Sequence, residues 1–415
     1  TSGHENTAIG RSSGLQLTEG GENVIVGYQA MTTDTKGHRA VAVGFNALAT
    51  QNFTTVTNNY NVAVGFNAGV AVTTGQRNTL IGGSTGDALT DADYNVAMGY
   101  NALGGDTLGS RSTALGYYAL AAQNFTTATD TYNTAVGFAA GELITTGNQN
   151  TLIGGLAGDA LTNSDRNVAV GYFALTTDTL GQYNTAIGYG SLQTQNFTTA
   201  TDSYNTAVGY GSGLSVTTGV QNTFVGGLAG DAITTGDENV VIGYGSDTSA
   251  VDSTNQIVMG RGVTGNANLS FCFGEAANDS AIAFGATSIT APSDIRLKED
   301  IQDEEVGLDF IKDLRPVTFQ WKKEKDVPSE MKAHVADSEE RVMNGKYNHG
   351  FIAQEVKEVI DNHGLKDGFD MWTEDETDGR QRIGEASLMP LMVKAIQELS
   401  AKVGELEDKL NNKGE

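Results

Sequence analysis

The segment SDIRLKEDI (293–301) contains a serine and a lysine, two residue types that can act together in nucleophilic chemistry. Ser293 supplies a hydroxyl and Lys298 an amine. Such a pair works only when the lysine is neutral, so Lys298 would have to be buried. His349, just ahead of GFIAQEV, is a candidate helper for proton transfer, although a surface loop histidine is an equally good interpretation. Taken alone, Ser293 and Lys298 are also compatible with an ordinary polar linker.

Glycan hydrolysis would need two carboxylates across a cleft. The acids of the N-terminal part instead recur identically as Asp87, Asp159 and Asp231, each in a G-D-A triplet. A catalytic pair should occur once, so the repetition favours a turn or capping role. Ca²⁺ on these aspartates is an alternative, although the calcium-binding G-G-x-G-x-D repeat is absent. A further alternative for the function of the N-terminal part is an ice- or surface-binding array formed by the Thr residues of the TTG triplets. We predict no metal and no cofactor.

The elements that must position these residues begin with a long internal repeat. Units such as NTAIG (6–10) and NVAVG (61–65) persist to QIVMG (256–260). The sequence number rises by 17 from one closing glycine to the next, except for three steps of 21 that start at Gly44, Gly116 and Gly188. Four steps make a 72-residue cassette, and each long step carries a similar insert. Repeats of this kind predict stacked coils, because one short strand cannot bury its face alone.

Each unit reads as a short strand closed by a glycine turn. Positions one and three are branched or apolar and share a face, whereas position two is usually Ala and points the other way. We expect the small second residue to let another surface approach closely, with Leu80, Leu152 and Phe224 breaking the pattern. Asn precedes the strand in 12 of 15 units, which predicts a ladder of amide hydrogen bonds or a simple turn preference.

The N-xx-[VI]-G coil resembles the head repeats of trimeric bacterial adhesins, which are parallel β-rolls packed three together. The resemblance implies a mainly β, trimeric β-roll or β-solenoid over residues 1–292. Two interpretations of the inserts stay open, a decorated receptor-binding face or packing under a longer loop. Their aromatic residues are Phe53, Phe125, Phe197, Tyr60, Tyr132 and Tyr204.

The sequence changes character near residue 293. Residues 1–293 carry 7 basic and 21 acidic residues, whereas 294–415 carry 18 and 29 in far less length. A helix around 308–314 is ended by Pro316, and VTFQW reads as a strand. The last helix, about 388–411, has apolar residues at heptad spacing, which predicts a coiled-coil subunit contact. These residues are Met389, Met392, Ile396, Leu399, Val403, Leu406 and Leu410.

Ser293-Asp294-x-Arg296-x-Lys298, GLDFIKDLRPVTFQWK, GFIAQEV and the terminal heptads resemble, in this order, the intramolecular chaperone of endosialidases and phage tail fibres. This family is also classed as self-cleaving serine peptidases. The resemblance implies a small α+β chaperone domain over 293–415 that trimerises the chain. It also implies release by cleavage between Ser293 and Asp294, so the mature fibre would lack this domain. A serine of a neighbouring subunit could attack, or Ser293 and Lys298 could position a water, because Ser293 attacking its own carbonyl would close a strained ring.

Composition limits the partners. The net charge of −25 argues against nucleic acid, which binds clustered Lys and Arg. The single Cys272 excludes an intrachain disulfide, and no apolar run of membrane-spanning length is present, so we expect no membrane insertion. We expect a tail fibre of a virion that folds in the bacterial cytoplasm. Its expected partners are further copies of the same chain, other tail proteins and a glycan or protein receptor on the host surface. A glycan-degrading tailspike enzyme and an adhesin-like bacterial surface protein are the alternatives.

Overall fold

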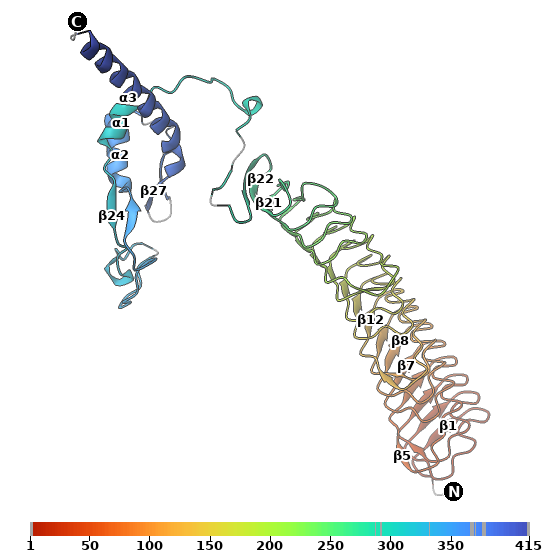
Figure 1. The fold of residues 1–415 in the computed structure, drawn as a ribbon. Helices are drawn as coiled ribbons and strands as arrows, with labels where there is room; N and C mark the ends of the chain where they lie inside the picture. The colour runs from red at the N-terminus through yellow and green to blue at the C-terminus, as the bar shows by residue number, and fades with distance from the viewer. Residues whose placement is uncertain are drawn as a thin grey trace. The chain divides into compact units, whose positions relative to one another are not determined.

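The computed structural model describes residues 3–286, 288–290, 293–331, 333–365, 369, 371–375 and 379–412. The chain forms two compact units, Thr1–Ser293 and Asp294–Glu415 (Figure 1). Each unit has a hydrophobic core of its own.

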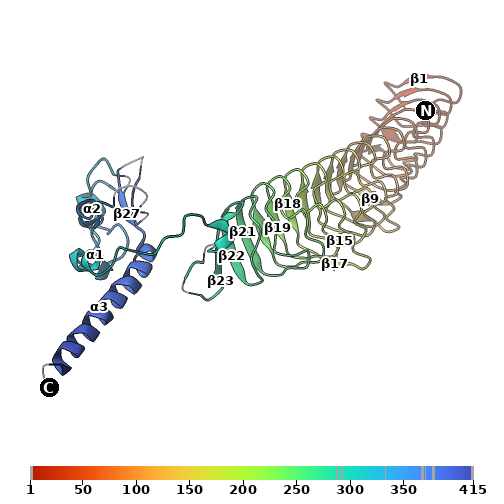
Figure 2. The same cartoon turned by 90° about the horizontal axis from the view of Figure 1, so that it is seen from above.

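The N-terminal unit is a β-solenoid, as the repeat predicts. Successive coils stack from β1 to β22, and each adds one strand in parallel to the strand of the coil before it (Figure 2). Equivalent residues pair throughout, for example Thr7 with Val24 and Thr79 with Val96. The strands are β1 (Thr7–Ile9), β2 (Val24–Val26), β4 (Val41–Val43), β6 (Val62–Val64), β7 (Thr79–Ile81), β8 (Val96–Met98), β10 (Thr113–Leu115), β12 (Thr134–Val136), β13 (Thr151–Ile153), β14 (Val168–Val170), β16 (Thr185–Ile187), β18 (Thr206–Val208), β19 (Thr223–Val225), β20 (Val240–Ile242), β21 (Gln256–Arg261) and β22 (Ser270–Glu275).

The last coil extends the series beyond the repeat recognised in the sequence. In β22, Cys272 occupies position two of a further unit, SFCFG, whose closing Gly274 follows Gly260 after a shortened step. The following strand β23 (Asn278–Ala283) pairs antiparallel with β22. The reversal of direction covers the edge of the final parallel strand, which would otherwise be open for pairing with another chain.

Position two faces the interior of the coil, which corrects the expected role of its small residue. Ala63 and Ala97 are fully buried, as is the second residue of every strand from β2 to β20. Positions one and three point outward and are half-buried or exposed. Alternation separates the two faces of a strand but does not say which face is inside. Ala fits here because larger side chains such as Leu48, Leu103 and Leu120 already occupy the same core.

Leu80, Leu152 and Phe224 occupy this same interior row, and glycines make room for them. A Cβ at Gly213 or Gly230 would lie 2.8 Å or 2.3 Å from the ring of Phe224. Gly69 and Gly86 flank Leu80 in the same way. The large second residue therefore fits where the neighbouring positions are glycines. These glycines recur once per cassette, and so does the large residue.

The asparagine before each strand joins coils through its carboxamide. Asn78 Oδ1 accepts from the backbone N–H of Asn95 (3.0 Å), and Asn78 Nδ2 donates to the carbonyl of Ala92 (2.7 Å). Direct amide–amide bonds accompany these in some coils, as from Asn184 to Asn167 (3.1 Å). The predicted amide ladder is thus partly right: its most regular bonds run from side chain to backbone. These bonds satisfy buried polar groups at every level.

Each long coil shares a buried polar network with the coil before it, and sequence reasoning missed this network. Asp34 is fully buried, and its carboxylate accepts from the N–H groups of Gly37 (3.0 Å) and Phe53 (3.1 Å) and from the Gln51 amide (2.6 Å). Gln51 in turn accepts from Asn61. Equivalent networks form around Asp106 and Asp178, and short parallel pairs border them, namely β3 (Gly37–His38) with β5 (Thr57–Asn58), β9 (Gly109–Ser110) with β11 (Thr129–Asp130) and β15 (Gly181–Gln182) with β17 (Thr201–Asp202).

The inserts of these long coils have two kinds of aromatic residue. Phe53, Phe125 and Phe197 are buried under the loop, as the packing interpretation predicts. The tyrosines Tyr60, Tyr132 and Tyr204 are 45–52% exposed. The phenylalanines are therefore not available to a receptor.

The C-terminal unit is a small α+β domain that ends in a long helix. Its core contains Phe310, Val356, Ile360, Met371 and Leu391. Its elements are η1 (Ile295–Leu297), α1 (Leu308–Asp313), β24 (Val317–Phe319), η2 (Glu324–Asp326), β25 (Asn348–Gly350), α2 (Ala353–Asn362), β26 (Trp372–Glu374), β27 (Gln381–Ile383), η3 (Glu385–Ser387) and α3 (Leu388–Asn411), with β24–β25 and β26–β27 antiparallel. None of the helices in the described ranges has the length and apolarity that a membrane crossing needs.

Asp247 stands where the preceding cassettes have Met31, Leu103 and Leu175, all fully buried. Its Oδ2 accepts from the N–H of Ala232 (3.1 Å), whereas its buried Oδ1 has no partner among the described residues. Burial, reinforced by the nearby carboxylate of Asp231, raises the pKa of Asp247 to about 7. A proton on Asp247 would let this side chain donate to Asp231.

The raised pKa predicts pH-dependent stability of the stalk. Folding takes up a proton between the ordinary Asp value of 3.8 and about 7, so stability should fall as pH rises through this window. Asp247→Leu should remove this loss and raise the thermal midpoint at pH 8 by about 5 °C. Thermal melts followed by far-UV circular dichroism at pH 5 and pH 8 measure the midpoint. Asp252→Leu, at an exposed position, is the matched control. Equal pH dependence in wild type and Asp247→Leu would contradict the assignment.

Candidate functional site

The predicted cleavage segment forms one tight turn. Asp294 caps η1: its carboxylate accepts from the N–H of Arg296 (2.8 Å) and pairs with the Arg296 guanidinium (2.6 Å). The hydrogen bonds from Arg296 lower the pKa of Asp294 below its usual value and keep this side chain ionised. Arg296 was part of the recognised motif, but sequence reasoning gave it no role.

Ser293 and Lys298 flank this turn, one before η1 and the other directly after it. Both side chains are exposed in the single chain. The described part of its own unit therefore does not give Lys298 the burial that a neutral amine requires.

His349 lies elsewhere in the C-terminal unit, in β25. Its Nδ1 is 3.3 Å from the hydroxyl of Thr318 on β24. It lines a groove of about 440 Å³, and Lys298 is not among the lining residues described. The groove residues are Pro316, Val317, Thr318, His349, Gly350, Phe351, Leu388, Met389 and Met392. The structure thus brings His349 next to the first predicted heptad residues, Met389 and Met392.

The helix α3 has two apolar faces. Leu388, Leu391 and Ala395 are buried against the body of the C-terminal unit. The predicted heptad residues lie on another face and are exposed to between 46% and 76%. We call them the heptad seam, and they are Met389, Met392, Ile396, Leu399, Val403, Leu406 and Leu410. Seven apolar side chains in one continuous row are unusual on a free surface, because each loses the benefit of burial.

Glu398 fixes α3 to the start of α1, a contact that sequence reasoning missed. Its Oε2 accepts from the N–H of Leu308 (2.9 Å) and so takes the place of an N-cap side chain, since Gly307 has none. A Cβ at Gly307 would lie 2.7 Å from the Glu398 carboxylate. No local signal announces this pair, because the residues are 90 positions apart.

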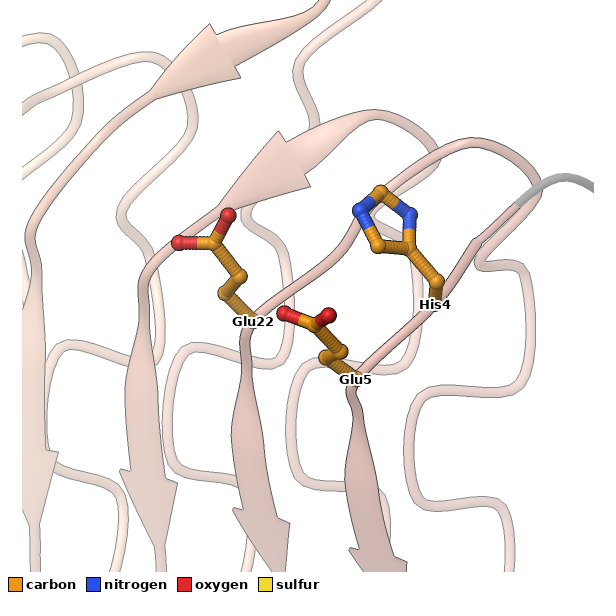
Figure 3. Close-up of side chains that lie close together, drawn as sticks. All are labelled: His4, Glu5 and Glu22. Carbon is orange, nitrogen blue, oxygen red and sulfur yellow. The ribbon is translucent and has the colours of Figure 1, made fainter.

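A possible cation-binding group lies on the first two coils of the stalk. His4, Glu5 and Glu22 offer ligand atoms within 4.8 Å of one another (Figure 3). All three are exposed, and Glu22 is paired with Arg39 (2.6 Å), which lowers the pKa of Glu22. A cation would have to compete with this guanidinium, so we assign no function to the group.

Comparison with known families identifies the C-terminal domain. Residues 293–365 match the model of the Peptidase S74 family, described as the chaperone of endosialidase. A search of curated proteins finds no match. The chain therefore carries a chaperone domain of the endosialidase type behind an N-terminal β-solenoid, as the sequence motifs predict. The match begins at Ser293, the first residue of the predicted cleavage site.

The contact between Glu398 and α1 can be tested in a chain that also carries Ser293→Ala, which should keep the predicted cleavage site uncut. Glu398→Ala should lower the free energy of unfolding of the C-terminal unit by about 1–2 kcal/mol, the usual effect of losing a helix cap. Both tryptophans, Trp321 and Trp372, lie in this unit, so their fluorescence during urea unfolding reports on it alone. Glu405→Ala, at an exposed position of α3, is the control and should leave the midpoint unchanged. Identical midpoints for the two variants would rule out a capping role.

Proposed function

We propose that this chain is a phage tail-fibre protein that attaches the virion to the host surface. The β-solenoid is the fibre, and the C-terminal domain is an assembly factor that is removed afterwards. Three copies associate through α3, fold their stalks in register and are then cut between Ser293 and Asp294. The mature fibre joins other tail proteins and meets a glycan or protein receptor on the host.

The exposed heptad seam is the observation that carries this proposal. A single chain leaves the whole row in water, whereas a coiled coil of several copies would bury it. The helix has 24 residues and is about 36 Å long, enough for the three heptads of the seam. Chaperone domains of this family also typically occur in trimeric proteins, which supports three copies.

The repetitive stalk explains why such a chaperone is useful. Each coil presents the same rows of residues, so neighbouring chains could pair one coil or one cassette out of step. Long-range pairing of this kind is slow and exposes strand edges meanwhile. A clamp at one end sets the starting point before the stalks pair. Once the clamp is removed, assembly is difficult to reverse. The fibre is then held together kinetically.

Cleavage hydrolyses the peptide bond between Ser293 and Asp294. The C–N bond breaks, the oxygen of one water ends in the new carboxylate of Ser293, and the new amine of Asp294 takes up a proton. Lys298, once neutral, accepts the proton from the attacking hydroxyl or water. Because one chain leaves Lys298 exposed, burial by the assembled trimer would make cutting depend on assembly. His349 is retained as a proton-transfer candidate.

Processing is tested by the mass of the expressed chain under denaturing conditions. The wild type should give two fragments, 1–293 and 294–415, and Ser293→Ala should remain intact at 415 residues. Ser288→Ala, a nearby exposed serine, should be cut like the wild type. An uncut wild type, or a cut Ser293→Ala, would sink the cleavage assignment.

Assembly is tested with two substitutions on α3 that introduce the same charge. Leu399→Asp places a carboxylate in the heptad seam and should abolish trimers and soluble stalk, because an unpaired charge would be buried. Ala401→Asp, exposed and off the seam, should behave like the wild type. Each variant is combined with Ser293→Ala, which should keep the chain uncut, and light scattering measures the molar mass of the assembly. A single-subunit mass in that background, with α3 present, would contradict the proposal.

A further inference from the structure

One side of the stalk is a long uncharged surface. It consists of positions one and three of each strand from β2 to β20, together with the residue after each closing glycine, and we call it the outer strand face. None of these residues is charged, and position three is always aliphatic or Met. Many are well exposed in the single chain, including Met98 (47%), Ile153 (40%) and Val225 (39%).

Aromatic rings form the third row of this face. Neighbouring rings stack, as in Tyr28 on Phe45 (5.1 Å between centroids) and Tyr189 on Tyr210 (5.4 Å). Most of the rings are roughly half exposed: they are Tyr28, Phe45, Phe66, Tyr100, Tyr117, Phe138, Tyr172, Tyr189, Tyr210 and Tyr244. Gly83, Gly155 and Gly227 interrupt the row once per cassette, and the ring of the next coil lies beside each glycine.

We propose that the outer strand face is the surface through which the stalks of neighbouring copies pack. With strands about 4.8 Å apart, thirteen coils make the face about 60 Å long. Exposed aliphatic and aromatic side chains that recur over thirteen coils are unusual on a free monomer, where exposed apolar patches are mostly small. Burial of the position-three row and of the aromatic row supplies most of the association free energy, whereas position one is Thr in seven of the thirteen strands and Val in the other six.

A second copy of this chain is the occupant that the face fits. A partner must match a regular rise of one coil over thirteen levels, and another stalk has the same rise and the same interruption once per cassette. The charge of the stalk also favours a second copy as the partner. The stalk carries 21 acidic residues against 7 basic ones, so parallel copies repel each other through most of their surfaces. The outer strand face is uncharged and avoids that repulsion.

This inference rests on the proposed trimer and adds where its stalks touch. Removal of the C-terminal domain takes the heptad seam away. The stalks then stay together only if they have a contact surface of their own, and the outer strand face supplies it.

The test uses single cysteines in the full chain and their rate of reaction with a bulky maleimide. Tyr210→Cys lies on the outer strand face, where the native ring is 61% exposed in one chain. Leu143→Cys and Val56→Cys lie off the face, at positions 50% and 63% exposed. Cys272 is fully buried and gives no background in the folded protein. Cysteine is small and uncharged, so the variants keep the fold.

We expect the cysteine at 210 to react at least 10-fold more slowly than those at 143 and 56 in the assembled protein. All three should react equally after denaturation. Equal rates in the folded state, slow reaction only at a control site, or slow reaction at all three would overturn the assignment. Light scattering of the same samples separates the two proposals. A trimer with fast labelling at 210 contradicts the outer strand face alone, whereas single subunits contradict the proposed function as well.

Discussion

The close approach of closing glycines in neighbouring coils governs the whole stalk. Gly65 has a φ of +145°, and a Cβ there would lie 2.2 Å from the carbonyl oxygen of Gly82 in the next coil. Only glycine tolerates both the angle and the contact. Because the backbones meet so closely at this corner, each coil lies directly over the last and equivalent residues fall into rows. The asparagine row, the interior row and the outer strand face all follow from this one contact.

Much of the stalk could be predicted from the sequence because its period is visible without any structure. The parallel solenoid is confirmed, and the recurrence of Asn was correctly linked to bonding between coils. The sequence does not show which side of the strand faces inward. Ala135 and its neighbours alternate between the two faces whichever face is buried. The last coil was missed because the step to Gly274 breaks the period. The network around Asp106 was missed because its members are spread along the chain from Asp106 through Gln123 to Asn133.

In the C-terminal unit, too, some features could be predicted from the sequence and others could not. Its helices and strands follow from local signals such as Pro316 after α1, and the heptad pattern correctly marks an apolar row on α3. Contacts between distant segments, such as Glu398 with α1, leave no local signal. The roles of Ser293, Lys298 and His349 remain predictions. One chain leaves Ser293 and Lys298 exposed, whereas a neutral lysine needs burial.

The cassette gives the stalk an adjustable length. Each cassette begins and ends on equivalent residues, so one block stacks on the next as well as on itself. Gain or loss of a block would change the reach of the rod by about 19 Å, four strand spacings, without any new packing problem. Unequal recombination within the gene can therefore tune how far the rod extends, while both of its ends keep their original surroundings.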